Sequence, residues 1–379
     1  MPIVSIPSLS FLVAGLAAVF FGAGSAVSPP PLGAARDISV GSTPQLIAAL
    51  KQARGGQRIL LAPGIYPPFS VRGIAPAGRV EIVSRDPKRR AVMTGMNMRG
   101  GGNLVFRNLV FQSAGTAVQE DFLFQGVRNL AFVGLIASGR PGRIGLQTDK
   151  ILLLRECTDV SVTRSDFTNA LIALSLLDSQ GVTVTSNHFH DLRMDGIRGG
   201  GNSSVLIAYN YITGFSPQGA DHPDAIQFWT SRQKNAAHDI TILGNVILRG
   251  RGKAMQGIFI RDENGSLPYR NVRIEDNLVA GTMFNGIAVL SESESLTLKG
   301  NVVSAFPDQK SWIRVGSKAV LEGNSAPIYL VGKQRVRALP NNQIMPARDD
   351  GGAAALKRWA RGRALDRYAP SLRRHVEGV

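Results

Sequence analysis

The sequence predicts an all-β solenoid, in which short parallel strands wind into one coil. Alternating apolar and polar residues, the pattern of a half-buried strand, recur with a period of about 25 to 32 residues, which is the signature of a repeat architecture. A sandwich or a propeller also has evenly spaced strands, but Asn-Gly or Asp-Gly hairpin turns do not alternate with these runs. We therefore expect one main domain with parallel sheets along its length.

Two repeated patterns carry this prediction. The first has the form polar, small, Ile, variable, and occurs at Asp195–Arg198, Asp224–Gln227, Gln256–Phe259 and Asn285–Ala288, with a degenerate copy at Ala170–Ala173. The second has alternating apolar positions, then Asn or Asp, then apolar residues, and occurs at Val160–Phe167, Val182–Phe189, Val205–Ile212, Ile240–Ile247, Val272–Val279, Leu296–Val303 and, as a closing copy, Val320–Asn324. We expect the recurring asparagines to occupy left-handed bends and to hydrogen-bond from turn to turn, which makes them structural.

The first residues have the order of a secretory signal. An apolar run from Leu9 to Val27 ends in small residues and is followed by Pro29–Pro31, although the first ten residues contain no Lys or Arg. We expect a signal peptide at residues 1–28 and a linker at 29–40. The alternative is an uncleaved membrane anchor, because the run is almost long enough to span a bilayer. The folded part is then secreted or periplasmic, with no stable membrane insertion of the mature chain.

The elements that follow predict how the coil begins. Hydroxyl residues before Pro44, then Leu46, Ile47 and Leu50 on one face, predict a short capping helix that ends at Gly55-Gly56. Strands are expected next, at residues 58–66, 80–83, 91–93 and 103–111. This opening, with its LLAPGIY strand, resembles that of pectate-lyase-like right-handed parallel β-helix proteins, especially the alginate-lyase and chondroitinase-B-like polysaccharide lyases. The resemblance implies a single-stranded right-handed parallel β-helix whose open end is plugged by the helix.

We assign this β-helix domain to residues 41–345 and a basic helical tail to residues 346–379. Within the tail, Ala353 to Tyr368 predicts a helix with Leu356, Trp359 and Leu365 as apolar points. Such a segment either covers the coil, the outcome we favour, or binds an anionic surface.

Composition narrows the class of partner. The formal net charge is +16, charged residues are sparse, and the chain has 42 glycines. A basic surface favours polyanions, and nucleic acid, anionic lipid and acidic polysaccharide all qualify; the alternative is that the arginines only keep the protein soluble. With the resemblance given above, we expect an acidic polysaccharide as the partner and not nucleic acid. Cys157 is the single cysteine, so an intramolecular disulfide is excluded and we expect a structural thiol.

The register of the repeats predicts a sugar-binding strip on one outer face. If the isoleucines of the first pattern point inward, period two places a first outward column at Arg198, Gln227, Phe259 and Ala288, and a second at Trp229 and Arg261. Aromatic rings stack on pyranose faces, and guanidinium groups pair with carboxylates. The alternative is an ordinary solvated face.

Asp195 and Asp224 stand at equivalent points on adjacent turns. Two carboxylates stacked about 5 Å apart repel each other, so one should have a raised pKa or a cation should lie between them. They can leave the interior only if the chain bends at Gly196 and Ala225, and the alternative is that both accept backbone N–H groups in a turn. The Asp-Gly-Ile-Arg segment resembles part of the polygalacturonase pattern, whose other motifs are absent.

His222 is the candidate for proton transfer. It precedes a strand and lies between Asp221 and Asp224, which could hold its tautomer. We expect Asp221 to help bind substrate. His188 and His190 should also face outward, on another face of the coil. No spacing matches a closed zinc site, no cofactor is required, and calcium bound by the aspartates is the one metal that we consider.

These residues suggest a polysaccharide lyase that cleaves a uronate-containing chain by β-elimination. Arg198 or Arg261 would neutralise the uronate carboxylate and His222 would remove the C5 proton, with Asp224 and Asp195 orienting His222 or holding a metal. The lysine and arginine setting of alginate-lyase-like relatives is not recognisable. A hydrolase that uses Asp195 and Asp224 as its carboxylate pair, and a non-catalytic glycan-binding or cell-surface β-helix, are the alternatives.

Overall fold

The computed structural model describes residues 37–115, 120–142, 145–233, 235–316 and 318–378. The expected signal peptide and most of the expected linker lie outside these ranges. The chain divides into a unit at Met1–Ala35 and a unit at Arg36–Val379, and the description below concerns the second.

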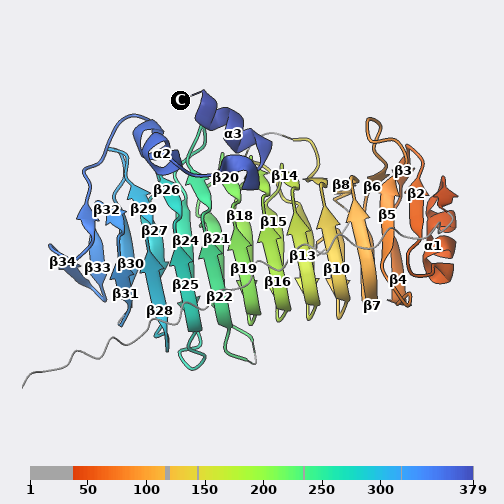
Figure 1. Cartoon of the computed structure of the whole chain (residues 1–379), viewed down its shortest axis with the longest axis horizontal. Coiled ribbons are helices and arrows are strands. Elements are labelled where there is room, and N and C mark those ends of the chain that lie inside the picture. Colours follow the sequence, from red (N-terminus) through yellow and green to blue (C-terminus); the bar gives the residue numbers. More distant parts are fainter. Residues whose placement is uncertain (1–36, 116–119, 143–144, 234, 317, 379) are drawn as a thin grey trace, which may run out of the picture. The chain divides into compact units, whose positions relative to one another are not determined.

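The second unit is a coil of parallel strands whose successive turns stack along three faces (Figure 1). Face A contains β1 (Ile38–Val40), β2 (Arg58–Leu61), β5 (Val80–Ser84), β7 (Met96–Arg107), β10 (Arg128–Val133), β13 (Thr158–Thr163), β16 (Gln180–Thr185), β19 (Ser203–Ala208), β22 (His238–Leu243), β25 (Arg270–Glu275), β28 (Leu296–Lys299) and β31 (Val320–Glu322). The coil therefore begins at β1, and the linker that we expected through residue 40 is three residues too long.

The other two faces complete each turn. Face B contains β3 (Ile65–Tyr66), β6 (Val92–Met93), β8 (Val110–Gln112), β11 (Ile136–Ser138), β14 (Asp166–Thr168), β17 (His188–His190), β20 (Tyr211–Thr213), β23 (Val246–Leu248), β26 (Leu278–Ala280), β29 (Val302–Ser304), β32 (Ser325–Ala326) and β35 (Gln343–Ile344). Face C contains β4 (Phe69–Ile74), part of the long β7, β9 (Phe122–Gln125), β12 (Lys150–Arg155), β15 (Ile172–Leu177), β18 (Asp195–Gly200), β21 (Asp224–Thr230), β24 (Gln256–Asp262), β27 (Phe284–Val289), β30 (Ser311–Val315), β33 (Tyr329–Val331) and β34 (Gln334–Val336). Among the strands of the described ranges, pairing is parallel except between β33 and β34.

The predicted asparagine ladder runs along the corner between faces A and B. In one turn of the ladder, Nδ2 of Asn245 donates to Ile207 O (2.9 Å), while Oδ1 of Asn245 accepts from the backbone N (3.1 Å) and Nδ2 (2.9 Å) of Asn210. The same arrangement links Asn187, Asn210, Asn245, Asn277, Asn301, Asn324 and Asn342. The ladder saturates backbone groups that the sharp corner leaves without strand partners.

One detail of this prediction is wrong. The left-handed residue is the one that precedes each ladder asparagine, for example Ser186 (φ 62°), Tyr209 (φ 59°) and Asp276 (φ 55°). The asparagine is therefore required for its amide group and not for its backbone conformation.

Both predicted helical regions cover the coil. Helix α1 (Thr43–Gln52) is capped by Ser42, whose hydroxyl accepts from Gln45 N, and it buries Leu46, Ala49 and Leu50 against the first turns. The tail forms α2 (Ala353–Ala360), the 3-10 helix η1 (Leu365–Arg367) and α3 (Pro370–Glu377), which lie along face B (Figure 1). No helix in the described ranges is long and apolar enough to cross a membrane.

Trp359 anchors the tail to face B. Its ring is 4% exposed, and its Nε1 donates to Asp276 O at 2.9 Å.

Replacing Trp359 by alanine removes about 3–5 kcal/mol of packing free energy. We expect this loss to release the tail locally, because the coil keeps its own core. Limited proteolysis should then cut within α2 and α3 faster than in the parent protein, with unchanged far-ultraviolet circular dichroism of the coil. Ile344→Ala, at an exposed position, is the control; equal cleavage of both variants would contradict this role.

Candidate functional site

The predicted outward columns exist on face C. Arg198 of β18 pairs in register with Gln227 of β21, which pairs with Phe259 of β24. Trp229 of β21 pairs with Arg261 of β24 in the second column. Strand pairing therefore brings the strip residues onto neighbouring turns, as the repeat alignment predicted.

The carboxylate pair lies at the start of these strands, where alternation breaks. Ala225 and Ile226 both lie in the hydrophobic core, although adjacent residues of a regular strand point to opposite faces. The chain therefore bends between them, and the side chain of Asp224 points away from the core. Neighbouring side chains nevertheless cover Asp195, which is 2% exposed, and Asp224, which is fully buried. Asp224 N donates to Asp195 Oδ1 at 3.4 Å, so Asp195 accepts a backbone N–H group, which is the alternative given above for these residues.

Burial governs the charge state of this pair. Desolvation, followed by the nearby Asp224 carboxylate, raises the pKa of Asp195 to about 7. Desolvation also raises the pKa of Asp224, although its hydrogen bond to His222 opposes this change. Oδ1 of Asp224 has no hydrogen-bond partner among the described residues. Burial therefore favours the protonated form of both carboxyl groups.

His222 lies over the buried carboxylate with its ring open to solvent. Its Nδ1 is 3.2 Å from Asp224 Oδ2, and its side chain is 59% exposed. The hydrogen bond to Asp224 raises the pKa of His222. Gln227 Nε2 donates to the same Asp224 oxygen at 2.8 Å. A buried carboxylate that orients an accessible imidazole is a common arrangement for a general base.

On the turns that follow His222, face C carries further hydrogen-bonded polar side chains that were not predicted as site residues. Gln256 Nε2 lies 2.6 Å from His222 Nε2, and Gln256 Oε1 accepts from Asn285 Nδ2. Trp312 Nε1 donates to Asn285 Oδ1 at 2.8 Å. The signal was present, because Gln256 and Asn285 occupy the same first position of the repeat as the two aspartates.

Arg198 lies beside the carboxylates and is held on several sides. Its guanidinium group is 3.6 Å from Asp195 Oδ2 and 3.9 Å from Glu120 Oε1, and its Nε donates to Ser175 Oγ at 3.1 Å. It also lies over the ring of Trp229, at 5.6 Å from the centroid. Glu120 and Ser175 were not predicted, and both help to fix the direction of this cation.

Three predicted roles change in the structure. Asp221 forms a two-point ion pair with Arg193 (2.7 and 3.1 Å) and accepts from Gln218 N, so it holds the loop and neither orients His222 nor faces substrate. Phe259 is 7% exposed and contacts the His222 ring edge-on, so it supports the imidazole and is not a stacking platform. Arg261 is exposed beside Trp229 and does not contact the carboxylates.

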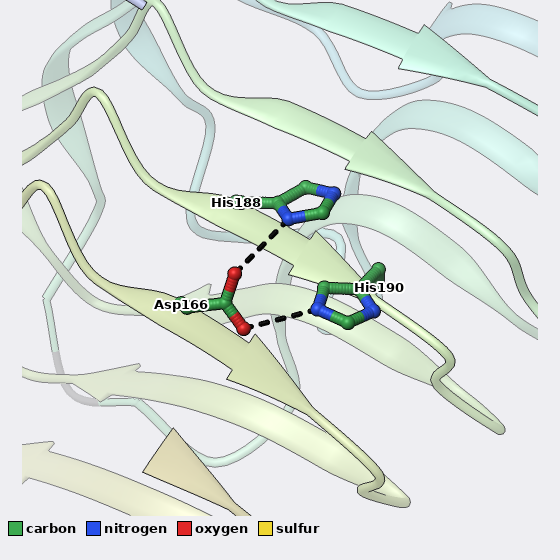
Figure 2. A group of neighbouring side chains, drawn as sticks. All are labelled: Asp166, His188 and His190. Atoms are coloured by element: carbon green, nitrogen blue, oxygen red, sulfur yellow. Dashed lines mark hydrogen bonds and ion pairs between the residues drawn. The ribbon is translucent and has the colours of Figure 1, made fainter. Parts of the chain in front are cut away.

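The metal-ligating group found among the described residues is elsewhere. It consists of Asp166, His188 and His190 on face B (Figure 2). Asp195 and Asp224 contact an arginine and a histidine rather than further carboxylates, so calcium at this pair remains only an expectation.

Comparisons with known proteins agree with this architecture. The family model described as right handed beta helix region matches residues 148–303, which include Asp195, His222 and Asp224. No curated protein sequence matches the chain.

Similar solved structures include PfbA, a surface protein and adhesin of Streptococcus pneumoniae, with 11% sequence identity and a TM-score of 0.50. The match covers 79% of this chain and 92% of the adhesin. The PL6 family alginate lyase AlyGC has 15% identity and a TM-score of 0.42, with 83% of this chain and 55% of the lyase covered. The pectate lyase Pel9A has 11% identity and a TM-score of 0.42, with 89% and 88% covered. The chain thus spans about half of the alginate lyase. The expected right-handed parallel β-helix is confirmed as the fold.

Proposed function

We propose that this protein is a secreted or periplasmic enzyme that cleaves an acidic, uronate-containing polysaccharide by β-elimination. The observation that carries the proposal is the solvent-open His222, oriented by buried Asp224 and placed on the same face as Arg198. The net charge of +16 favours a polyanionic substrate.

The proposed reaction assigns one role to each of these groups. The guanidinium group of Arg198 pairs with the uronate carboxylate and stabilises the charge that develops when the C5 proton leaves. His222 Nε2 accepts that proton, so Gln256, which bonds this nitrogen in the free protein, must yield its place to the sugar. The C5–H electron pair forms the C4–C5 double bond, and the C4–O bond breaks as the leaving oxygen takes a proton from the imidazolium or from water. Trp229 and Arg261 extend the binding surface along the polymer.

Hydrolysis by the carboxylate pair is the second candidate. The raised pKa of Asp195, about 7, is the observation that favours it, because a protonated carboxyl is what a glycosidase uses as its acid. Both carboxylates would have to reach the glycosidic bond, however, and they are 2% and 0% exposed. We therefore prefer elimination, in which these carboxylates act through His222 and Arg198.

The products formed from a panel of uronate polymers separate the candidates. Elimination creates a C4–C5 double bond that absorbs ultraviolet light, together with new reducing ends. New reducing ends without this absorbance would indicate hydrolysis and overturn the proposal. Binding of a polymer without either product would indicate a non-catalytic glycan-binding protein.

The pH dependence of turnover provides an independent prediction. Because Asp224 raises the pKa of His222 above its ordinary 6.5, the imidazole is protonated at mildly acidic pH and cannot accept a proton. We expect kcat/KM to be low below pH 6.5 and to rise as the pH passes the raised pKa. A hydrolase that uses protonated Asp195 would lose activity above a pH of about 7. A rate that falls over that range would therefore contradict the role of His222 as a base.

A further inference from the structure

A second polar cluster lies on face B, away from the residues of the proposed active site. Asp166 belongs to β14, and His188 and His190 belong to β17 on the next turn (Figure 2). Asp166 pairs in register with His188, and Phe189 between the two histidines points into the core. Both imidazoles therefore lie on the outer side of the coil, as the sequence predicted.

The three side chains converge on one point. Asp166 Oδ2 is 3.1 Å from His188 Nδ1, and Asp166 Oδ1 is 3.0 Å from His190 Nε2. One potential ligand atom from each residue lies within 4.8 Å of the others. Bonds of about 2.0–2.1 Å in a tetrahedral zinc site place neighbouring ligand atoms about 3.3 Å apart. Small side-chain movements are thus enough to admit an ion.

We infer that Asp166, His188 and His190 form a binding site for a divalent transition metal such as zinc. Two imidazoles and one carboxylate are ligands that zinc accepts, and three protein ligands leave a fourth position open. The second repeat already aligns Asp166 with His188 on adjacent turns, but the approach of His190 to the same carboxylate is visible only in the structure.

The surroundings hold the ligands in the orientation that a metal requires. His190 Nδ1 lies 2.6 Å from Asp191 Oδ2, the carboxylate contact that orients metal-bound histidines and raises their basicity. The His188 ring is stacked between His190 and Tyr211, with centroid distances of 4.2 and 4.9 Å. These contacts are present before any ion binds, so little ordering is needed.

A groove adjoins two of the three proposed ligands. It has a volume of about 640 Å³ and is lined by Asp166 and His188, and also by Arg164, Arg374 and Ser371 beside the start of α3. Two further arginines of this groove are already bonded, Arg90 to Gly134 O and Arg107 to Glu81.

The charges around the groove decide what kind of ligand completes the site. The positive charges of the arginines disfavour the binding of a bare cation, but the negative charges of Asp166 and Asp191 offset two of them. An anionic fourth ligand, such as a carboxylate, would pair with the arginines and the ion together. Ser371 Oγ, which lines this groove and has no partner among the described residues, could bond to the same ligand.

Titration of the purified, tag-free full-length protein with Co²⁺ and Zn²⁺ tests this inference. We expect about one equivalent of Co²⁺ to produce visible absorption bands of a tetrahedral complex, and Zn²⁺ to displace it. His188→Ala and Asp166→Asn should weaken binding by more than about 100-fold, and Asp191→Asn by about 10–100-fold. His238→Ala removes the exposed histidine that pairs with Asp239 and should leave binding unchanged.

The outcome in the parent protein decides the inference, because it does not depend on whether a variant folds. Absence of saturable Co²⁺ or Zn²⁺ binding would show that the cluster is only an ion-pair network. Equal binding by the parent protein and the folded His188→Ala variant would place the ion elsewhere. Neither result would bear on the face C proposal.

Discussion

Replacing His222 by alanine is expected to lower turnover by about 10²–10⁴-fold, the range typical for loss of a general base. The ring is largely solvent-exposed and contacts Asp224, Gln256 and Phe259 from outside the core, so the coil should keep its packing. Initial rates of double-bond formation measure the first effect, and thermal melting measures the second.

His238→Ala is the matched control for this experiment. His238 also pairs through Nδ1 with an aspartate, Asp239, at 2.8 Å, and is 43% exposed, but it lies on face A. We expect this variant to keep full activity. If His222→Ala kept it as well, His222 would have no place in the mechanism.

Replacing Asn245 by alanine is expected to destabilise the coil by about 3 kcal/mol or more. The substitution leaves the carbonyl of Ile207 and both the backbone N and Nδ2 of Asn210 without this partner, in a fully buried corner. Each buried polar group left unsatisfied costs about 1–3 kcal/mol. Equilibrium unfolding in urea measures the change.

Asn264→Ala provides the comparison, because Asn264 lies exposed in a loop and bonds to Asp262 through its backbone N. We expect its effect to stay within about 0.5 kcal/mol. A loss at Asn245 no greater than that at Asn264 would show that the ladder does not stabilise the coil.

The repeats predicted the fold because each turn of a solenoid has the same alternation of inward-facing and outward-facing residues. Alternation located the strands, and aligning Ile197, Ile226 and Ile258 gave their register, which the strand pairing reproduces. The alignment of the degenerate copy at Ala170–Ala173 is wrong, because Leu174 and not Ile172 pairs with Ile197. The residues of the strip could therefore be placed on neighbouring turns without coordinates.

This alternation does not predict the burial or the partners of a side chain where the strand bends or where a residue from another segment contacts it. Period two could not show that Phe259 is covered, or that Arg193 would take Asp221 away from His222. Glu120 contacts Arg198 from a loop outside the repeat pattern, so no alignment of repeats could find it. Gln256 could have been found, since it follows Asp195 and Asp224 in the same repeat position.

A crystal structure of the His222→Ala protein with a bound oligouronate tests most directly whether face C holds the site of β-elimination. We expect the sugar to lie on face C, with a uronate carboxylate on Arg198 and its C5 hydrogen directed at the position that the imidazole has left. An oligouronate bound elsewhere, or one whose carboxylates avoid Arg198, would contradict this expectation.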